Sequence, residues 1–248
     1  MDKTVVKAFR VLELLVQADA PMSVTKLAAE TGMQKSNVHR LLSTLGQLGY
    51  VRKGESSLYE PSLRIWEMGQ RVYSRLSLAS VARPILRRLM EQTGESAHLA
   101  MFDRVETVYI DRVETENPVR AYTVIGGRAP AYCTASGKAL LAWQPVETVR
   151  AVAATIRRLT PETIADLPAL TKELALVRSQ GYAINVGEFR DNVAGLAAPV
   201  RLGNGEVIAA AGISGPLDRL RPRKIRSLAP AVVSAAQAIA RMMVAPRR

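Results

Sequence analysis

The segment Ser23–Tyr50 constrains the fold more than any other part of the 248-residue chain. Its pattern predicts two short helices joined by a tight turn at Thr31–Gly32–Met33. Four apolar residues of the second helix recur at helical spacing, so they form one stripe that must pack against neighbouring helices. They are Val38, Leu41, Leu42 and Leu45.

The other residues of the second helix are mostly polar or basic, and most of them lie in its first two turns. A helix that offers amide, hydroxyl and cationic groups near its N-terminus suits the major groove of double-stranded DNA, where base edges present donors and acceptors. We therefore interpret it as a DNA-recognition helix; the alternative is a solvated helix face. Which residues read bases and which anchor phosphates stays open. The candidates are Gln34, Lys35, Ser36, Asn37, His39, Arg40 and Ser43.

The segments around this pair of helices complete a small domain. Apolar periodicity predicts a helix at Lys3–Gln17, and Ser23 is expected to cap the helix Val24–Glu30. Tyr50–Pro61 alternates around a polar turn at residues 54–57, which is typical of two short strands. A winged helix-turn-helix domain is therefore predicted over residues 1–61. In its wing, Arg52 and Lys53 would contact phosphates, which position a protein without reading sequence.

The charge of the chain agrees with a nucleic-acid partner but does not locate the contact. The net charge is +12; residues 1–78 hold 11 basic and 7 acidic side chains, and residues 79–248 hold 23 and 15. An excess of positive charge favours polyanionic partners. A solvated, arginine-rich surface explains the charge equally well.

The cysteine count and the hydropathy of the chain exclude several classes of protein. Cys133 is the only cysteine, which excludes an intrachain disulfide and a cysteine-cluster zinc site and is typical of a reducing cytoplasm. No secretory signal pattern is seen. The apolar run Leu228–Ala245 is interrupted by proline, polar and charged residues, so it reads as an amphipathic or core helix. We expect a cytoplasmic protein with no membrane partner, no metal and no cofactor.

The pattern changes beyond the wing. A helix at Leu63–Leu78 is expected to act as a linker over residues 62–78, followed by a second domain over residues 79–248. Strands interleaved with helices indicate an α+β or α/β architecture for this domain. Helices are predicted at residues 80–93, 135–143, 146–156, 164–180 and 223–244, and strands at residues 97–102, 107–113, 119–125, 182–186, 195–202 and 206–214.

Three stretches, in the same order along the chain, resemble the IclR family of bacterial transcription regulators. The first is TGMQKSNVHRLLSTLGQLGYV at Thr31–Val51, and the second is GGRAPAYCTASGKALLA at Gly126–Ala142. The third combines GYAINVGEF, VAGLAAPV and AAAGISGP within residues 181–216. Together they cover the chain nearly end to end.

The resemblance implies an α+β protein with an N-terminal winged helix-turn-helix, a linker helix and a C-terminal effector-binding domain like the GAF and PAS folds. Such regulators act as homodimers or homotetramers on pseudo-palindromic operators, and a small organic or aromatic acid alters their DNA binding. Two recognition helices spaced by a turn of DNA combine their free energies of binding. Whether this chain represses or activates, and which operator it reads, stays open.

The resemblance also implies an effector pocket. The run Ala135–Ser136–Gly137 is expected to open a helix whose free N–H groups could hold a ligand carboxylate. An ordinary cap with close helix–sheet packing is the alternative. The residues that the resemblance places at the pocket are Ala129, Cys133, Ala135, Ser136, Asn185, Val193, Gly195, Gly212 and Ser214.

Three of these positions depart from the common pattern of the family. Asn185 stands where an acid is frequent, Gly195 where cysteine is frequent, and Gly212 where a hydroxyl is frequent. The pocket is therefore expected to be roomier and less acidic than that of relatives that bind very small keto acids. Our hypothesis is a larger ligand, such as a sugar acid or an aromatic acid.

Two other classes of protein remain as alternatives. A cysteine enzyme would need a base that forms the Cys133 thiolate, and nothing in the spacing brings His98 to it. No Walker loop, HExxH or paired-cysteine pattern occurs, so we expect no catalytic residue and no enzyme. A nonspecific architectural DNA binder would not distinguish its own upstream DNA from random DNA.

Overall fold

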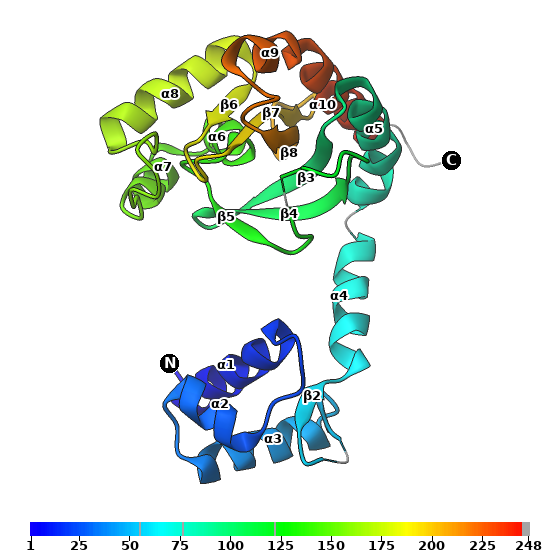
Figure 1. Ribbon diagram of the computed structural model, residues 1–248, viewed down its shortest axis with the longest axis vertical. Coiled ribbons are helices and arrows are strands. Elements are labelled where there is room, and N and C mark those ends of the chain that lie inside the picture. The colour runs from blue at the N-terminus through cyan, green and yellow to red at the C-terminus, as the bar shows by residue number, and fades with distance from the viewer. Residues whose placement is uncertain (55, 76, 122, 245–248) are drawn as a thin grey trace. The chain divides into compact units, whose positions relative to one another are not determined.

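The computed structural model describes residues 1–54, 56–75, 77–121 and 123–244. The chain forms two compact units, Met1–Leu76 and Ser77–Arg248, which we call the N-terminal and C-terminal units (Figure 1). Three predicted features, the wing turn, the linker helix and the strand at residues 119–125, each contain one residue outside the described part of the chain. These residues are Glu55, Leu76 and Tyr122.

The N-terminal unit is the winged helix-turn-helix that the sequence predicts, followed by a further helix. The Asp2 carboxylate caps α1, and the Ser23 hydroxyl accepts a hydrogen bond from the Lys26 amide at the start of α2. Gly32 has a left-handed conformation (φ 69°), so it ends α2 and allows the tight turn into α3. The elements are α1 (Lys3–Gln17), α2 (Val24–Thr31), α3 (Lys35–Gln47), β1 (Val51–Lys53), β2 (Tyr59–Pro61) and α4 (Leu63–Arg75).

The apolar stripe of α3 lies in the core of this unit, as predicted. It packs against Val11 and Leu15 of α1 and Leu27 of α2, all of which are buried. The wing is fixed by the antiparallel pairing of β1 with β2 and by two backbone hydrogen bonds between Met22 and Tyr59. Because one face of α3 is used for packing, the opposite face is left exposed.

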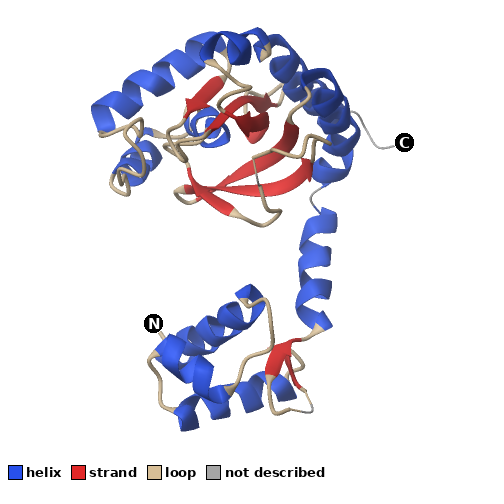
Figure 2. Ribbon diagram, viewed as in Figure 1, coloured by secondary structure: helices blue, strands red, loops and turns tan. Residues whose placement is uncertain are grey.

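The C-terminal unit is built on one six-stranded antiparallel sheet in the order β5-β4-β3-β8-β7-β6, with helices on both faces (Figure 2). This is the predicted α+β architecture. Its strands are β3 (Ser96–Asp103), β4 (Glu106–Val113), β5 (Arg128–Pro130), β6 (Ala183–Val186), β7 (Val193–Arg201) and β8 (Val207–Pro216). Its helices are α5 (Ser77–Thr93), α6 (Ala135–Leu141), α7 (Val146–Ala153), α8 (Leu167–Gln180), α9 (Pro222–Ser227) and α10 (Ala229–Val244).

Alternation along the central strands gives this sheet two buried faces. Leu99, Leu196 and Ile213 face a core formed with α5 and α10. Neighbouring positions such as Ala197 and Ala210 face a second core formed with α6, α7 and α8. Because side chains alternate with a period of two, His98 lies on the same side of β3 as the α6 layer.

The prediction of a strand at residues 119–125 is wrong. The outer edge of β4 pairs with β5, with Thr107 opposite Ala129. Gly126 and Gly127 also bond to the backbone of Tyr109, so this edge has no place for another strand. Val119 and Val124 are exposed, which shows that the apolar character of this segment does not reflect burial in a sheet.

The predicted helix at residues 223–244 is two helices, α9 and α10, that meet at Leu228. Pro230 has no backbone N–H, so it is disfavoured in the interior of a helix but fits the first turn of a new one. Likewise, α8 begins at Leu167 because Asp166 caps it and Pro168 occupies its first turn. Among the residues described, no helix is both long and apolar enough to cross a membrane.

Candidate functional site

The exposed face of α3 carries the predicted DNA contacts. Asn37 is half-buried, and the other six candidates on or beside this helix are exposed. Their side chains make no hydrogen bond or ion pair with described residues of the protein, so their donors and acceptors are free to meet another molecule. The structure therefore brings together Gln34, Lys35, Ser36, Asn37, His39, Arg40 and Ser43 on one surface.

The two wing residues are less alike than the sequence suggests. Arg52 forms an ion pair with Glu60 on the neighbouring strand, at 2.9 Å between Nε and Oε1. Lys53 extends over the Tyr59 ring, with its Nζ 5.9 Å from the ring centroid. An exposed ion pair contributes at most about 1 kcal/mol, so a phosphate can compete for Arg52, whereas the charge of Lys53 has no acidic partner in the described structure. Both remain candidate phosphate contacts.

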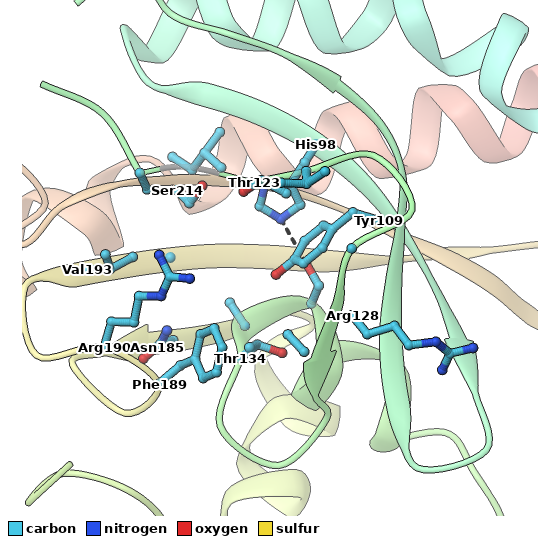
Figure 3. A pocket seen from close by; sticks show the side chains of 18 residues that line it. His98, Tyr109, Thr123, Arg128, Thr134, Asn185, Phe189, Arg190, Val193 and Ser214 are labelled. Atoms are coloured by element: carbon cyan, nitrogen blue, oxygen red, sulfur yellow. Dashed lines mark hydrogen bonds between the residues drawn. The ribbon is translucent and has the colours of Figure 1, made fainter. Parts of the chain in front are cut away.

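A cavity lies in the C-terminal unit between the sheet, the start of α6, residues 121, 123, 124 and 127 ahead of β5, and the loop at residues 187–192 (Figure 3). Its volume is about 160 Å³, far more than the roughly 10–15 Å³ that one water requires, so it can take a small organic molecule. Seven of the nine predicted pocket residues line it. They are Ala129, Ala135, Ser136, Asn185, Val193, Gly195 and Ser214.

The two remaining predicted residues, Cys133 and Gly212, do not line the cavity. Burial raises the pKa of the Cys133 thiol to about 12, and its sulfur lies 3.8 Å from the Pro130 carbonyl oxygen, so it packs as an apolar group. Gly212 has no open space beside it: a Cβ at this position would lie 2.7 Å from the Leu196 carbonyl oxygen, 2.8 Å from the Ala197 Cβ and 2.9 Å from Nε2 of His98. The departure at Gly212 therefore makes room for His98 and does not enlarge the cavity.

His98 is the main cavity residue that sequence reasoning missed. Its Nε2 lies 2.8 Å from the Ser136 hydroxyl oxygen, and its ring meets the edge of Tyr109 at a centroid distance of 5.2 Å. The side chain is buried, and desolvation lowers its pKa to about 4. His98 is thus a neutral hydrogen-bonding group at physiological pH. A single histidine on a strand carries no local signal that distinguishes this role from ordinary packing.

The start of α6 is closely packed. Thr134 caps the helix, because its hydroxyl oxygen accepts a hydrogen bond from the Gly137 amide at 3.1 Å. A Cβ on Gly137 would lie 2.4 Å from the backbone of Ala131, so only glycine fits there. The helix has seven residues. The small-residue run is therefore explained in large part by packing, which was the alternative to an anion site.

Further along α6, Lys138 is held by two carboxylates. Its side chain is 1% exposed, and its Nζ lies 2.8 Å from Glu173 Oε1 and 2.6 Å from Glu188 Oε1. Burial raises the pKa of Glu188 to about 6, although the charge of Lys138 opposes this shift. The Glu188 backbone amide also donates to Oδ1 of the cavity residue Asn185, at 2.9 Å. This cluster ties α6 and α8 to the loop that borders the cavity.

We expect the C-terminal unit to lose stability as the pH falls from about 6.5 towards 4, because unfolded His98 takes up its proton before folded His98 does. The contribution of neutral His98 to the free energy of unfolding is fully present above the pKa of His98 in the unfolded chain. It is lost as the pH falls through the pKa of His98 in the folded protein. Between pH 7 and pH 5 it amounts to about 2 kcal/mol. Denaturant titrations of the parent and of His98→Gln at these two pH values measure it. Equal losses in both proteins would contradict a buried neutral imidazole.

Comparisons with known proteins agree with this arrangement. Residues 4–55 match the IclR helix-turn-helix domain, and residues 70–241 match the domain described as bacterial transcriptional regulator IclR C-terminal. The chain belongs to the IclR family. As a member of it, the protein is a DNA-binding transcription regulator and not an enzyme.

Individual IclR-family members resemble the chain over nearly its full length. The HTH-type transcriptional regulator KdgR of Escherichia coli is 34% identical over 97% of this chain and 92% of its own. The transcriptional repressor IclR of the same organism is 29% identical over 96% and 88%. The crystal structure of an IclR homolog from Microbacterium hydrocarbonoxydans, complexed with 4-hydroxybenzoate, matches with 25% identity and a TM-score of 0.84 over 96% and 98% of the two chains.

Proposed function

We propose that the protein is a repressor of a catabolic pathway in the bacterial cytoplasm. In this proposal the exposed face of α3 reads a pseudo-palindromic operator, and a small organic or aromatic acid in the cavity of the C-terminal unit changes the affinity for that operator. The observation that carries the proposal is the pairing, in one chain, of an unpartnered polar helix face with an internal cavity large enough for such an acid.

A homodimer, or a homotetramer built from it, is part of the proposal. Within the N-terminal unit, α1 exposes Val5 and Phe9, and α4 exposes Trp66 and Val72. Large exposed apolar side chains grouped on one element mark interaction surfaces, and two copies of α3 would supply the selectivity that one helix lacks. An effector can act only if it binds the DNA-competent and DNA-incompetent arrangements of such a dimer with different affinity.

Fluorescence anisotropy with DNA from upstream of the protein's own gene tests the proposal. We expect a preference of roughly 10³-fold or more over random duplex at physiological salt, and a weaker complex when the correct acid is added. Equal affinity for both duplexes would indicate a nonspecific architectural binder and would contradict the proposal. Tight binding of glyoxylate or pyruvate would contradict our hypothesis of a larger ligand.

A further inference from the structure

The charge of the cavity lining is one-sided. None of the described residues that line it is acidic, and two arginines, Arg128 and Arg190, are present. Arg128 is already neutralised, because its guanidinium pairs with Asp103 and, at 2.9 Å, with Glu106. Arg190 has no acidic partner in the described structure; its guanidinium carbon lies 5.4 Å from the centroid of the neighbouring Phe189 ring. Among the described lining residues, one cation is therefore available for a ligand.

Tyr109 is a hydrogen-bond donor that the cavity can use. Its hydroxyl makes no hydrogen bond within the described structure, and it lines the cavity. Burial raises the pKa of Tyr109 to about 12, although the charge of Arg190 favours the ionised form, so the phenol stays protonated. Figure 3 shows Tyr109 and Arg190 on facing sides of the cavity, whereas the Arg128 guanidinium points away from both. Two donors, one of them charged, thus face the same space.

The start of α6 does not offer a comparable place for a carboxylate. The helix is short, the Thr134 hydroxyl is used in its cap, and the Ser136 hydroxyl is already bonded to His98. A buried carboxylate is stable only if charged or hydrogen-bonding groups replace its water. Arg190 and Tyr109 meet that need without breaking a bond that the protein already makes.

The other lining residues indicate what kind of ligand body the cavity can hold. Phe189 and Val193 present apolar surface to the cavity. The Asn185 side-chain oxygen, like the Thr134 and Ser136 hydroxyls, is occupied by hydrogen bonds within the protein. The Ser214 hydroxyl and Nδ1 of His98 are buried without a hydrogen-bond partner in the described structure. These two groups can pair with one or two ligand hydroxyls, whereas the further hydroxyls of a polyhydroxylated ligand would lose water without gaining partners, which is costly for each one. The lining suits a flat, mainly apolar body better than a polyhydroxylated one.

We propose that Arg190 and Tyr109 together bind the carboxylate of a monocarboxylic acid that has an apolar ring as its body. The inference rests on the proposed function and narrows its effector class to ring acids. It also makes Arg190, in the exposed loop between β6 and β7, the residue that determines specificity for the ligand carboxylate.

Isothermal titration of the full-length protein with 4-hydroxybenzoate and with 4-hydroxybenzamide tests the inference, because the two probes differ only in the carboxylate. We expect the acid to bind at least about tenfold more tightly than the amide. Arg190→Gln should weaken binding of the acid by about 10- to 100-fold and leave the amide unchanged. Tyr109→Phe should weaken the acid by about tenfold. Gluconate, a polyhydroxylated acid, should bind more weakly than 4-hydroxybenzoate.

The matched control is Arg88→Gln, which removes an exposed arginine of α5 outside the cavity and should bind both probes like the parent. Failure of the parent to bind 4-hydroxybenzoate, equal binding by Arg190→Gln, or tighter binding of gluconate would each overturn the inference. Operator affinity is measured on the same samples. If the operator is still selected while the acid is not bound through Arg190, only this inference fails; if the operator is not selected, the proposed function fails.

Discussion

Replacing Lys138 with methionine should lower the free energy of unfolding of the C-terminal unit by about 3–5 kcal/mol. Methionine keeps much of the length of the side chain, so the loss is mainly that of the charge. It leaves Glu173 and Glu188 without the cation that now lies within 2.8 Å of both. Two carboxylates in a poorly hydrated place repel each other and lack the solvation they have in the unfolded chain.

Trp143 allows this loss to be measured in the correct unit. It is one of two tryptophans in the chain, so a Trp66→Phe background leaves it as the only one, and its fluorescence follows denaturant unfolding of the C-terminal unit. Adding Glu173→Gln and Glu188→Gln to Lys138→Met should restore much of the stability, because no buried charge is then left unpaired. A single-variant loss below about 1 kcal/mol would contradict the assigned role of Lys138.

The pH dependence of Lys138→Met gives a second check. A buried carboxyl group whose pKa is raised in the folded state destabilises the fold least when it is protonated. Its contribution to the free energy of unfolding is therefore present at low pH and is lost as the pH rises through the folded-state pKa. For Glu188 in the parent that value is about 6. Removal of the neighbouring cation raises the pKa further, so the defect of Lys138→Met should be smaller at pH 5 than at pH 8. A defect that grows as the pH falls would contradict this account.

Replacing Arg40 with alanine should weaken operator binding by about 100-fold in a dimer, since a lost contact of ~1.4 kcal/mol then counts twice. Arg40 is exposed on α3, and its side chain makes no hydrogen bond or ion pair within the described structure, so the fold and the affinity for the acid should not change. Anisotropy titrations measure the loss. Arg223→Ala is the matched control, because it removes an equally exposed arginine from α9 and the same net charge.

The salt dependence of these titrations separates the two roles left open for Arg40. If it contacts a phosphate, the variant should reduce the slope of log K against log salt by about 1 for each lost contact and weaken all sequences alike. If it reads a base, the slope should hold and discrimination at one operator position should relax. An affinity equal to that of the parent would show that this face of α3 does not bind the operator.

The helix-turn-helix could be predicted from sequence because each of its signals is local. The stripe of α3, the Ser23 cap and the turn at Gly32 all lie within one short segment, and each has a fixed geometric meaning. The segment at residues 119–125 shows the limit of that reasoning. It has the apolar composition of a strand, but the edge of β4 is taken by β5, and only the complete sheet reveals that.

The cavity could be predicted only in part, since its polar groups come from distant parts of the chain. The resemblance predicted Ser136 and Ser214, which line the cavity. His98 and Tyr109 lie on β3 and β4, where their spacing gives no sign of a shared site. Gly212 was predicted to enlarge the pocket, yet the space it leaves is filled by the His98 ring. The space beside Gly212 is thus occupied by a side chain of the paired strand β3, which the sequence alone does not show.

Arg190 lies on an exposed loop, apart from the packed sheet and α6, and this position affects how easily the ligand specificity of the cavity can change. Substitution of a solvent-facing loop residue changes the stability of the fold little. Single substitutions at this position can therefore change the ligand specificity of the cavity. His98, enclosed between strands, admits no such freedom. A change of ligand preference through residue 190 would therefore leave the sheet and α6 intact.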